Sequence, residues 1–187
     1  SSQGFGKNRS IREVLFLFPL CERGSIWDAV EDIGQDAPHP FPERSALRLF
    51  LGACRGTDAI HQKGWAHRDI KPHNVLITAD GTPILMDLGS VTKARVEIKS
   101  RQEGLLLEDE AASKSSAPYR APELFEAPKP PAVVDEKVDV WSLGCTLYCM
   151  AFFWSPFESP TEGVQKLGVL NGRVKFPEPC KKNGAPF

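Results

Sequence analysis

Two short stretches carry the side chains of this sequence that could do chemistry. Residues 67–74 read HRDIKPHN and place a carboxylate (Asp69), an ammonium group (Lys71) and a carboxamide (Asn74) within one tight loop. Residues 87–89 read DLG and add a second carboxylate, Asp87, after a short apolar run. This set suits phosphoryl transfer, in which metal ions and a cation neutralise phosphate charge while a carboxylate orients the attacking hydroxyl.

A helix and a hairpin are expected on either side of the 67–74 loop. Residues 43–63 are predicted to form a helix that ends at Gly64. The residues that recur there at helical spacing are Leu47, Phe50, Cys54, Thr57 and Ile60. Residues 75–77 and 84–86 are apolar and flank the turn signal at 80–81 (DG), so they are predicted to pair as a hairpin.

The remaining pattern predicts a chain with more helix than strand. Residues 14–18 (VLFLF) read as a buried strand, and residues 25–33 read as a short helix. Residues 90–117 are polar and rich in small side chains, which indicates a long surface segment with helical turns near 103–112. Residues 138–153 are apolar almost all round and predict a buried helix. The tail from Ser155 onward alternates loop with one helix near 161–171.

Composition excludes several classes of protein. The chain has 187 residues, of which 41% are hydrophobic, so it can form one domain or one large lobe. Its 23 basic and 24 acidic residues give a net charge of −1, which argues against nucleic acid as a partner. No apolar stretch approaches the length of a transmembrane segment. The five cysteines are interpreted as reduced, buried thiols rather than disulfides or zinc ligands.

Four motifs occur in the order and at separations that resemble eukaryotic protein kinases. Residues 67–74 resemble the kinase catalytic loop, and residues 87–89 resemble the magnesium motif, with Leu in place of Phe. Residues 121–123 (APE) resemble the end of the activation segment, and residues 139–144 (DVWSLG) resemble the buried central helix. The lysine in the catalytic loop is similar to that of the serine/threonine branch.

A finer resemblance is to the Numb-associated kinase family. It depends on the runs at 54–56 (CRG), 66–69 (AHRD), 85–90 (LMDLGS) and 119–124 (YRAPEL), together with Arg23-Gly24. The long insert between the magnesium motif and the APE motif also fits that family.

The kinase resemblance implies a role for each residue of the catalytic set. Asp69 would accept a hydrogen bond from the substrate hydroxyl and orient it for in-line attack, and Lys71 would offset charge on the transferred group. Ser116 would bond to both of these side chains. Asn74 and Asp87 would supply the oxygen ligands that a hard Mg²⁺ ion prefers.

The resemblance also implies a nucleotide site for ATP. Leu76 matches the apolar residue under the adenine ring, while Asn74 and Asp87 would bind the phosphates through Mg²⁺. The strand end and hinge, whose backbone would bind adenine, correspond to Phe18, Pro19, Leu20 and Cys21. His67 and Leu88 would stack in the apolar spine behind the site.

The implied fold is α+β, mainly α-helical, and protein-kinase-like. Residues 1–13 would be a polar start and residues 14–24 the last small-lobe strand and the hinge. Residues 25–187 would form the large C-terminal lobe, truncated at its C-terminal end. The glycine-rich loop, the ATP-pairing lysine and its glutamate are not found in the sequence, so the N-lobe is expected to be largely absent.

Two functions remain open at this stage. The first is an ATP- and Mg²⁺-dependent kinase that phosphorylates Ser or Thr hydroxyls of protein substrates, with this chain alone transferring poorly or not at all. The second is a kinase-like binding or scaffold module without turnover. The complete polar set favours the enzyme, whereas the missing lobe favours the scaffold. The expected location is cytoplasmic, with peripheral attachment to Golgi or other membranes and anchoring by lipid left open.

Overall fold

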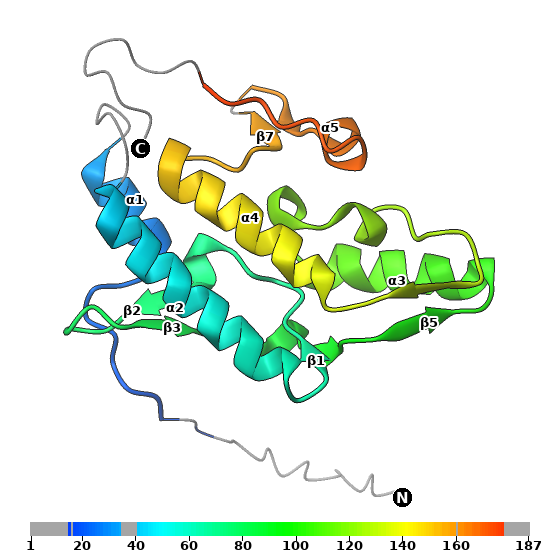
Figure 1. Ribbon diagram of the computed structural model, residues 1–187, viewed down its shortest axis with the longest axis horizontal. Helices are drawn as coiled ribbons and strands as arrows, with labels where there is room; N and C mark the ends of the chain where they lie inside the picture. Colours follow the sequence, from blue (N-terminus) through cyan, green and yellow to red (C-terminus); the bar gives the residue numbers. More distant parts are fainter. Residues whose placement is uncertain (1–14, 16, 35–40, 160, 178–187) are drawn as a thin grey trace, which may run out of the picture.

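The computed structural model describes residues 15, 17–34, 41–159 and 161–177 (Figure 1). Helices dominate a mixed α/β arrangement. The helices are α1 (Ile26–Ile33), α2 (Glu43–His61), α3 (Arg101–Lys114), α4 (Lys137–Phe152) and α5 (Lys166–Leu170). The antiparallel strand pairs are β1 (Trp65–Ala66) with β4 (Thr92–Lys93), β2 (Val75–Ile77) with β3 (Pro83–Leu85), β5 (Val96–Ile98) with β6 (Ala132–Val134), and β7 (Glu158–Ser159) with β8 (Gly163–Val164).

Helix α4 is the centre of the packing. Its apolar side chains contribute to all three core clusters, through Leu143 and Met150 in the first, Val138 in the second, and Cys145 and Cys149 in the third. Figure 1 shows α4 in yellow, with α2 on one side and α3 on the other. The predicted buried helix is therefore confirmed, and its apolar composition follows from contact with three core clusters. Only a narrow side of it, at Lys137, Val140 and Gly144, is exposed.

Helix α2 is also confirmed, but its buried stripe matches the predicted one only in part: Thr57 is buried, and Phe50 and Cys54 pack partly buried against the core. Its buried residues are Ala46, Leu49, Ala53 and Thr57. Leu47, from the predicted stripe, is 52% exposed. Small residues face inward because β3 packs closely on the helix: a Cβ atom placed on Gly52 would lie 2.0 Å from the ring of Pro83.

The short helix predicted at 25–33 is confirmed as α1, and it begins with a reciprocal cap. The Ser25 hydroxyl accepts from the Asp28 amide at 3.1 Å, and the Asp28 carboxylate accepts from the Ser25 amide at 2.6 Å. The segment before the helix is attached to β2, since Ser25 forms a bridge with Leu76 and the Ile77 amide donates to the Gly24 carbonyl at 2.8 Å.

The predicted hairpin at 75–86 is confirmed as β2–β3, but the strand predicted at 14–18 is wrong. Residues 15, 17 and 18 have no strand geometry, and Leu15 and Leu17 are 86% and 100% exposed. A strand needs a neighbour to pair with, and no described strand lies beside this segment. Residues 14 and 16, like the polar start at 1–13, lie outside the described residues.

The segment 90–117 is more ordered than its composition indicates. It contains β4, β5 and α3, and the helix is longer than the predicted turns at 103–112 because Ser100 caps its start by accepting from the Glu103 amide at 3.3 Å. In the tail, α5 is shorter than the predicted 161–171 helix, since β8 takes up residues 163 and 164. No described helix is long and apolar enough to cross a bilayer.

Two glycine substitutions test the close packing of α2 on β3. Gly52→Ala should lower the free energy of unfolding by about 1–3 kcal/mol, because the added methyl group overlaps the rigid Pro83 ring. Gly144→Ala in α4 is the matched control, since nothing lies within 4 Å of its Cβ position. It should raise stability by up to about 1 kcal/mol through helix propensity. Urea unfolding measures both; equal effects would contradict the proposed contact.

Candidate active site

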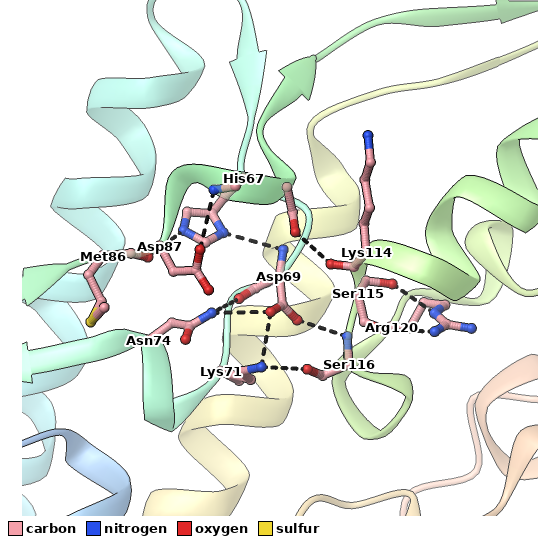
Figure 2. Close-up of polar contacts among 12 residues, drawn as sticks. His67, Asp69, Lys71, Asn74, Met86, Asp87, Lys114, Ser115, Ser116 and Arg120 are labelled. Atoms are coloured by element: carbon pink, nitrogen blue, oxygen red, sulfur yellow. Dashed lines mark hydrogen bonds and ion pairs between the residues drawn. The ribbon is translucent and has the colours of Figure 1, made fainter. Parts of the chain in front are cut away.

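The loop at 67–74 is held between two strand pairs. Before it, β1 pairs with β4, and after it, β2 pairs with β3. The Met86 amide donates to the Asn74 carbonyl at 2.8 Å, which extends the β2–β3 pairing by one step. Asp87 follows Met86 directly, so the hairpin places the second predicted carboxylate beside the end of the catalytic loop (Figure 2).

Asp69 and the three polar residues around it form one network (Figure 2). One carboxylate oxygen accepts from the Ser116 amide at 2.8 Å. The other lies 3.0 Å from the Lys71 ammonium and accepts from the Asn74 side-chain amide at 3.2 Å. Lys71 also donates to the Ser116 hydroxyl at 2.7 Å. The structure therefore brings together Asp69, Lys71, Asn74 and Ser116, as the sequence predicts.

The Asp69 carboxylate is ionised at neutral pH. Burial alone would raise its pKa, but hydrogen bonds from Lys71 and Ser116 outweigh burial and hold the pKa below the ordinary value of 3.8. A carboxylate with a low pKa is a weak base. It is better suited to accept a hydrogen bond and orient a hydroxyl than to remove a proton early in a reaction.

His67 connects this network to the segment that carries Asp87. Its ring is fully buried, and its Nε2 atom lies 3.0 Å from the Met86 carbonyl oxygen. Because a carbonyl can only accept, Nε2 carries a proton. The Nδ1 atom then accepts from the Asp69 amide at 3.3 Å. Leu88 is 61% exposed, so the predicted apolar spine of His67 and Leu88 is not packed here.

Asp87 has an unusual backbone conformation. Its φ of 62° and ψ of 71° are left-handed, a region that Asp and Asn enter more readily than most residues. One carboxylate oxygen accepts from the Gly89 amide at 3.3 Å and begins the short turn Leu88–Ser90. The exposed carboxylate retains a second oxygen that accepts no hydrogen bond from the described part of the chain.

Asn74 and Asp87 fit a magnesium ion by their chemistry. Asn74 donates its NH₂ group to Asp69, which leaves its carbonyl oxygen without a donor from the described residues. Carboxylate and carboxamide oxygens are hard ligands of the kind Mg²⁺ prefers. Across the described ranges, no group of three or more His, Cys, Asp or Glu side chains could hold a metal ion. Mg²⁺ in proteins is commonly held by one or two side-chain oxygens together with waters or phosphate oxygens, which a pair such as Asn74 and Asp87 could provide for.

The residues predicted to bind adenine are only partly brought together. Leu76 is half-buried in β2, and Cys21 is half-buried nearby, since its carbonyl accepts from the Gly24 amide at 3.2 Å next to the bridge at Ser25. Phe18 and Leu20 are 77% and 83% exposed, and Pro19 between them is also exposed. Their role in nucleotide binding stays a prediction.

The sequence analysis missed the role of Asp139 in α4. Its carboxylate is fully buried and accepts from the backbone amides of His67 at 2.7 Å and Arg68 at 2.8 Å. His61, at the end of α2, lies 2.8 Å from the same carboxylate through Nε2. The sequence did contain one indication of this role. A lone carboxylate within an apolar helix must accept hydrogen bonds from buried donors.

Two further contacts position Ser116 and were also missed. The Ser142 hydroxyl in α4 donates to the Tyr119 carbonyl at 2.8 Å. Arg120 donates to the hydroxyl and the carbonyl of Ser115 at 2.8 and 2.7 Å, and its guanidinium lies 4.7 Å from the centre of the Phe125 ring. Both contacts hold the turn after α3 against the core.

Residues 5–181 match the model of the protein kinase domain, and the chain belongs to that family. It is 44% identical to Serine/threonine-protein kinase 16 of Rattus norvegicus and of Homo sapiens over 146 residues, which is 78% of this chain and 47% of each relative. It is 40% identical over 153 residues to Serine/threonine-protein kinase ENV7 of Saccharomyces cerevisiae, covering 80% and 41% of the two chains. The chain thus spans about half the length of the curated relatives it matches.

Replacing Asp139 tests its role as the anchor of the catalytic loop. In Asp139→Asn an NH₂ group must face a backbone N–H, so a buried donor loses its acceptor. We expect the free energy of unfolding to fall by at least about 2 kcal/mol in urea titrations. Asp109→Asn, an exposed site on α3, is the control and should change stability by less than about 0.5 kcal/mol. Equal stability of the two variants would refute the anchor.

Proposed function

We propose that this chain carries the phosphoryl-transfer centre of a protein serine/threonine kinase. ATP is the donor, and Ser or Thr hydroxyls of proteins are the acceptors. The observation that carries the proposal is the network in which Asp69 contacts Lys71, Asn74 and Ser116, with Asp87 adjoining through the hairpin. The names of the relatives support the same activity, since they are serine/threonine-protein kinases.

Each side chain has a place in the transfer. The acceptor oxygen forms a bond to the γ-phosphorus of ATP while the bond from that phosphorus to the bridging oxygen of ADP breaks. Asp69 orients the acceptor hydroxyl and takes its proton as the new bond forms. The Lys71 ammonium, fixed by Asp69 and Ser116, offsets negative charge on the transferred group.

Asn74 and Asp87 would hold Mg²⁺, and the adenine site would lie at Leu76 and the segment from Phe18 to Cys21. When bound, the metal supplies positive charge beside the phosphates. The attachment of residues 21–25 to β2 supports the adenine assignment, because it brings that segment to the strand that contains Leu76.

We further propose that the chain corresponds to the large lobe with the hinge of a kinase. Sheets of only two strands in the described part, together with coverage of about half of each relative, support this assignment. The motifs at 54–56, 66–69, 85–90 and 119–124 support its membership of the Numb-associated family, near the myristoylated and palmitoylated serine/threonine kinase of that family. Lipid anchoring, and a cytoplasmic location at the surface of Golgi or other membranes, follow as proposals from that placement.

Asp69→Ala tests the catalytic assignment. In the longest product that the gene encodes, the variant should transfer ³²P from ATP to a Ser-containing peptide at least 100-fold more slowly, because the hydroxyl is no longer oriented. Asp109→Ala, which also removes an exposed carboxylate from the same fold, should transfer at the original rate. We expect the 187-residue chain alone to transfer slowly. An unchanged rate in Asp69→Ala would contradict the proposal and would favour a binding module without turnover.

Asp87→Asn tests the magnesium assignment separately from turnover. Asn tolerates the left-handed backbone at this position, so the turn should persist while one charged ligand is lost. Calorimetric titration with ATP should show at least a tenfold weaker affinity in the presence of Mg²⁺ and little change in its absence. Asp109→Asn should bind as the original protein does. Equal Mg²⁺-dependent affinity in the Asp87 variant would contradict the assignment.

A further inference from the structure

The strand pair that precedes the catalytic loop has an exposed face with cations and a tryptophan on it. Trp65 and Lys93 are directly opposite each other in the β1–β4 pair. The two side chains of such a pair lie on the same face of the ladder. One further backbone hydrogen bond, of 2.9 Å, extends the pairing toward Lys63 and Arg95. All four residues are exposed, Trp65 by 43%.

The same face continues along β5. The exposed residues of this run alternate along the chain and are Lys93, Arg95, Glu97 and Lys99. Ala94 and Ile98, which lie between them, are buried, and Ile98 belongs to the second core cluster. Residues two apart in an extended chain point to the same side, so the alternation assigns the charged side chains to the outer face. On β6, Val133 is opposite Glu97 and is 40% exposed.

We call this surface the basic strand face, and define it by Lys63, Trp65, Lys93, Arg95, Lys99 and Val133. Three of its cations form no ion pair or side-chain hydrogen bond within the described part of the chain: Lys63, Lys93 and Arg95. The carboxylates beside them have other partners. Glu97 is paired with Lys99 at 3.1 Å, and Asp135, directly after β6, lies 3.9 Å from Lys137. The basic strand face therefore has unopposed positive charge.

This positive charge is local, because the whole chain has a net charge of −1. The Debye length is about 10 Å at an ionic strength of 0.1 M, so a partner is attracted mainly by the charges that face it. A partner of the basic strand face is therefore expected to be anionic and to contact this side of the molecule rather than the chain as a whole.

Trp65 indicates what kind of anionic partner fits. An indole ring has an apolar body and one N–H donor, and tryptophan is enriched at the boundary between water and lipid. Lysine and arginine residues that face an anionic bilayer each raise the affinity by about fivefold. A bilayer surface requires no groove in the protein. It requires cations and an interfacial aromatic ring that point the same way, and both are present on this face.

The basic strand face is separate from the transfer site. Figure 1 shows β1 and β5 on the opposite side of α4 from β7 and α5. None of the residues that define the face belongs to the Asp69 network or to the proposed magnesium ligands. Because β1 leads directly into the catalytic loop, a contact at Trp65 would nevertheless lie only four positions from Asp69 along the chain.

We propose that the basic strand face is a contact surface for anionic membranes. Lys63, Lys93 and Arg95 lie against the headgroups of anionic lipids, and Trp65 enters the headgroup layer beside them. This contact goes beyond the lipid anchoring proposed above, because it requires no acyl chain. It keeps the transfer site near acceptor proteins that are themselves attached to the membrane, and it does not take part in phosphoryl transfer.

Sedimentation with phospholipid vesicles tests the proposal. The longest product that the gene encodes is made in a host that adds no acyl chain. Vesicles of phosphatidylcholine are compared with vesicles in which about one third of the lipid is phosphatidylserine. We expect binding to the anionic vesicles only. Binding should be lost when the ionic strength rises from about 0.1 M to about 1 M, because the Debye length falls to about 3 Å.

Two double variants locate the charge effect. Lys93→Gln combined with Arg95→Gln should weaken binding to the anionic vesicles at least tenfold. Arg44→Gln combined with Arg48→Gln is the matched control, since it removes two exposed cations from α2 and changes the net charge equally. The control should bind as the unaltered protein does. Both double variants should transfer phosphate to a soluble peptide at the original rate, which separates this test from that of Asp69→Ala.

Tryptophan fluorescence locates the aromatic contact. Brominated phospholipids quench a tryptophan that enters the headgroup layer. Trp65→Phe should remove most of the quenching that anionic brominated vesicles cause. Trp154→Phe is the matched control, because Trp154 is 40% exposed against 43% for Trp65 but lies outside the basic strand face. It should leave the quenching in place.

Four results would overturn the proposal. The first is a failure of the unaltered protein to bind anionic vesicles, and the second is an equal loss of binding in the two double variants. The third is unchanged quenching in Trp65→Phe, which would locate the contact elsewhere. The fourth is tighter binding of single-stranded DNA or of a polyglutamate peptide than of vesicles at the same ionic strength, which would assign the face to another class of partner.

Discussion

The carboxylate of Asp139 is the contact on which the geometry of the catalytic loop depends. It accepts from the amides of two consecutive loop residues, His67 and Arg68, and from His61 at the end of α2. A fully buried carboxylate is costly unless every donor around it is in place. The carboxylate therefore tolerates only one position of the loop relative to α4. Apolar contacts between a loop and a helix are less directional and would permit sliding.

This anchor extends to the reacting groups through a short series of contacts. His67 donates to the Met86 carbonyl, and Met86 precedes Asp87. Arg68, with a φ of 69°, and Asp87, with a φ of 62°, are both left-handed. Such backbone costs of order 1–3 kcal/mol per residue and persists only where neighbouring bonds impose it. The hydrogen bonds to Asp139 and Met86 supply that constraint, so the strained residues adjoin the groups that the chemistry uses.

The sequence predicts the features that a local residue pattern determines. It does not predict the features that depend on contacts between residues far apart in the chain. The apolar periodicity predicts α2 but only part of its buried face, because the close approach of Pro83 at Gly52 favours small residues such as Ala53 on the side that faces the core. The run at 14–18 has strand composition but no described neighbour to pair with. The set of Asp69, Lys71 and Asn74 was predictable because one loop contains all three. The Asp139 anchor was not assigned, since it joins groups 71 and 72 positions apart and leaves no periodic signal.

Arg68 and Asp69 are adjacent but have different surroundings. Asp69 contacts Lys71 and Ser116, whereas Arg68 lines a cavity beside α3. The C-terminal end of that helix is itself linked to the catalytic centre, because Ser90 donates to the Lys114 carbonyl and Arg120 holds Ser115 (Figure 2). A displacement of α3 must therefore strain contacts one residue from Ser116 and three from Asp87.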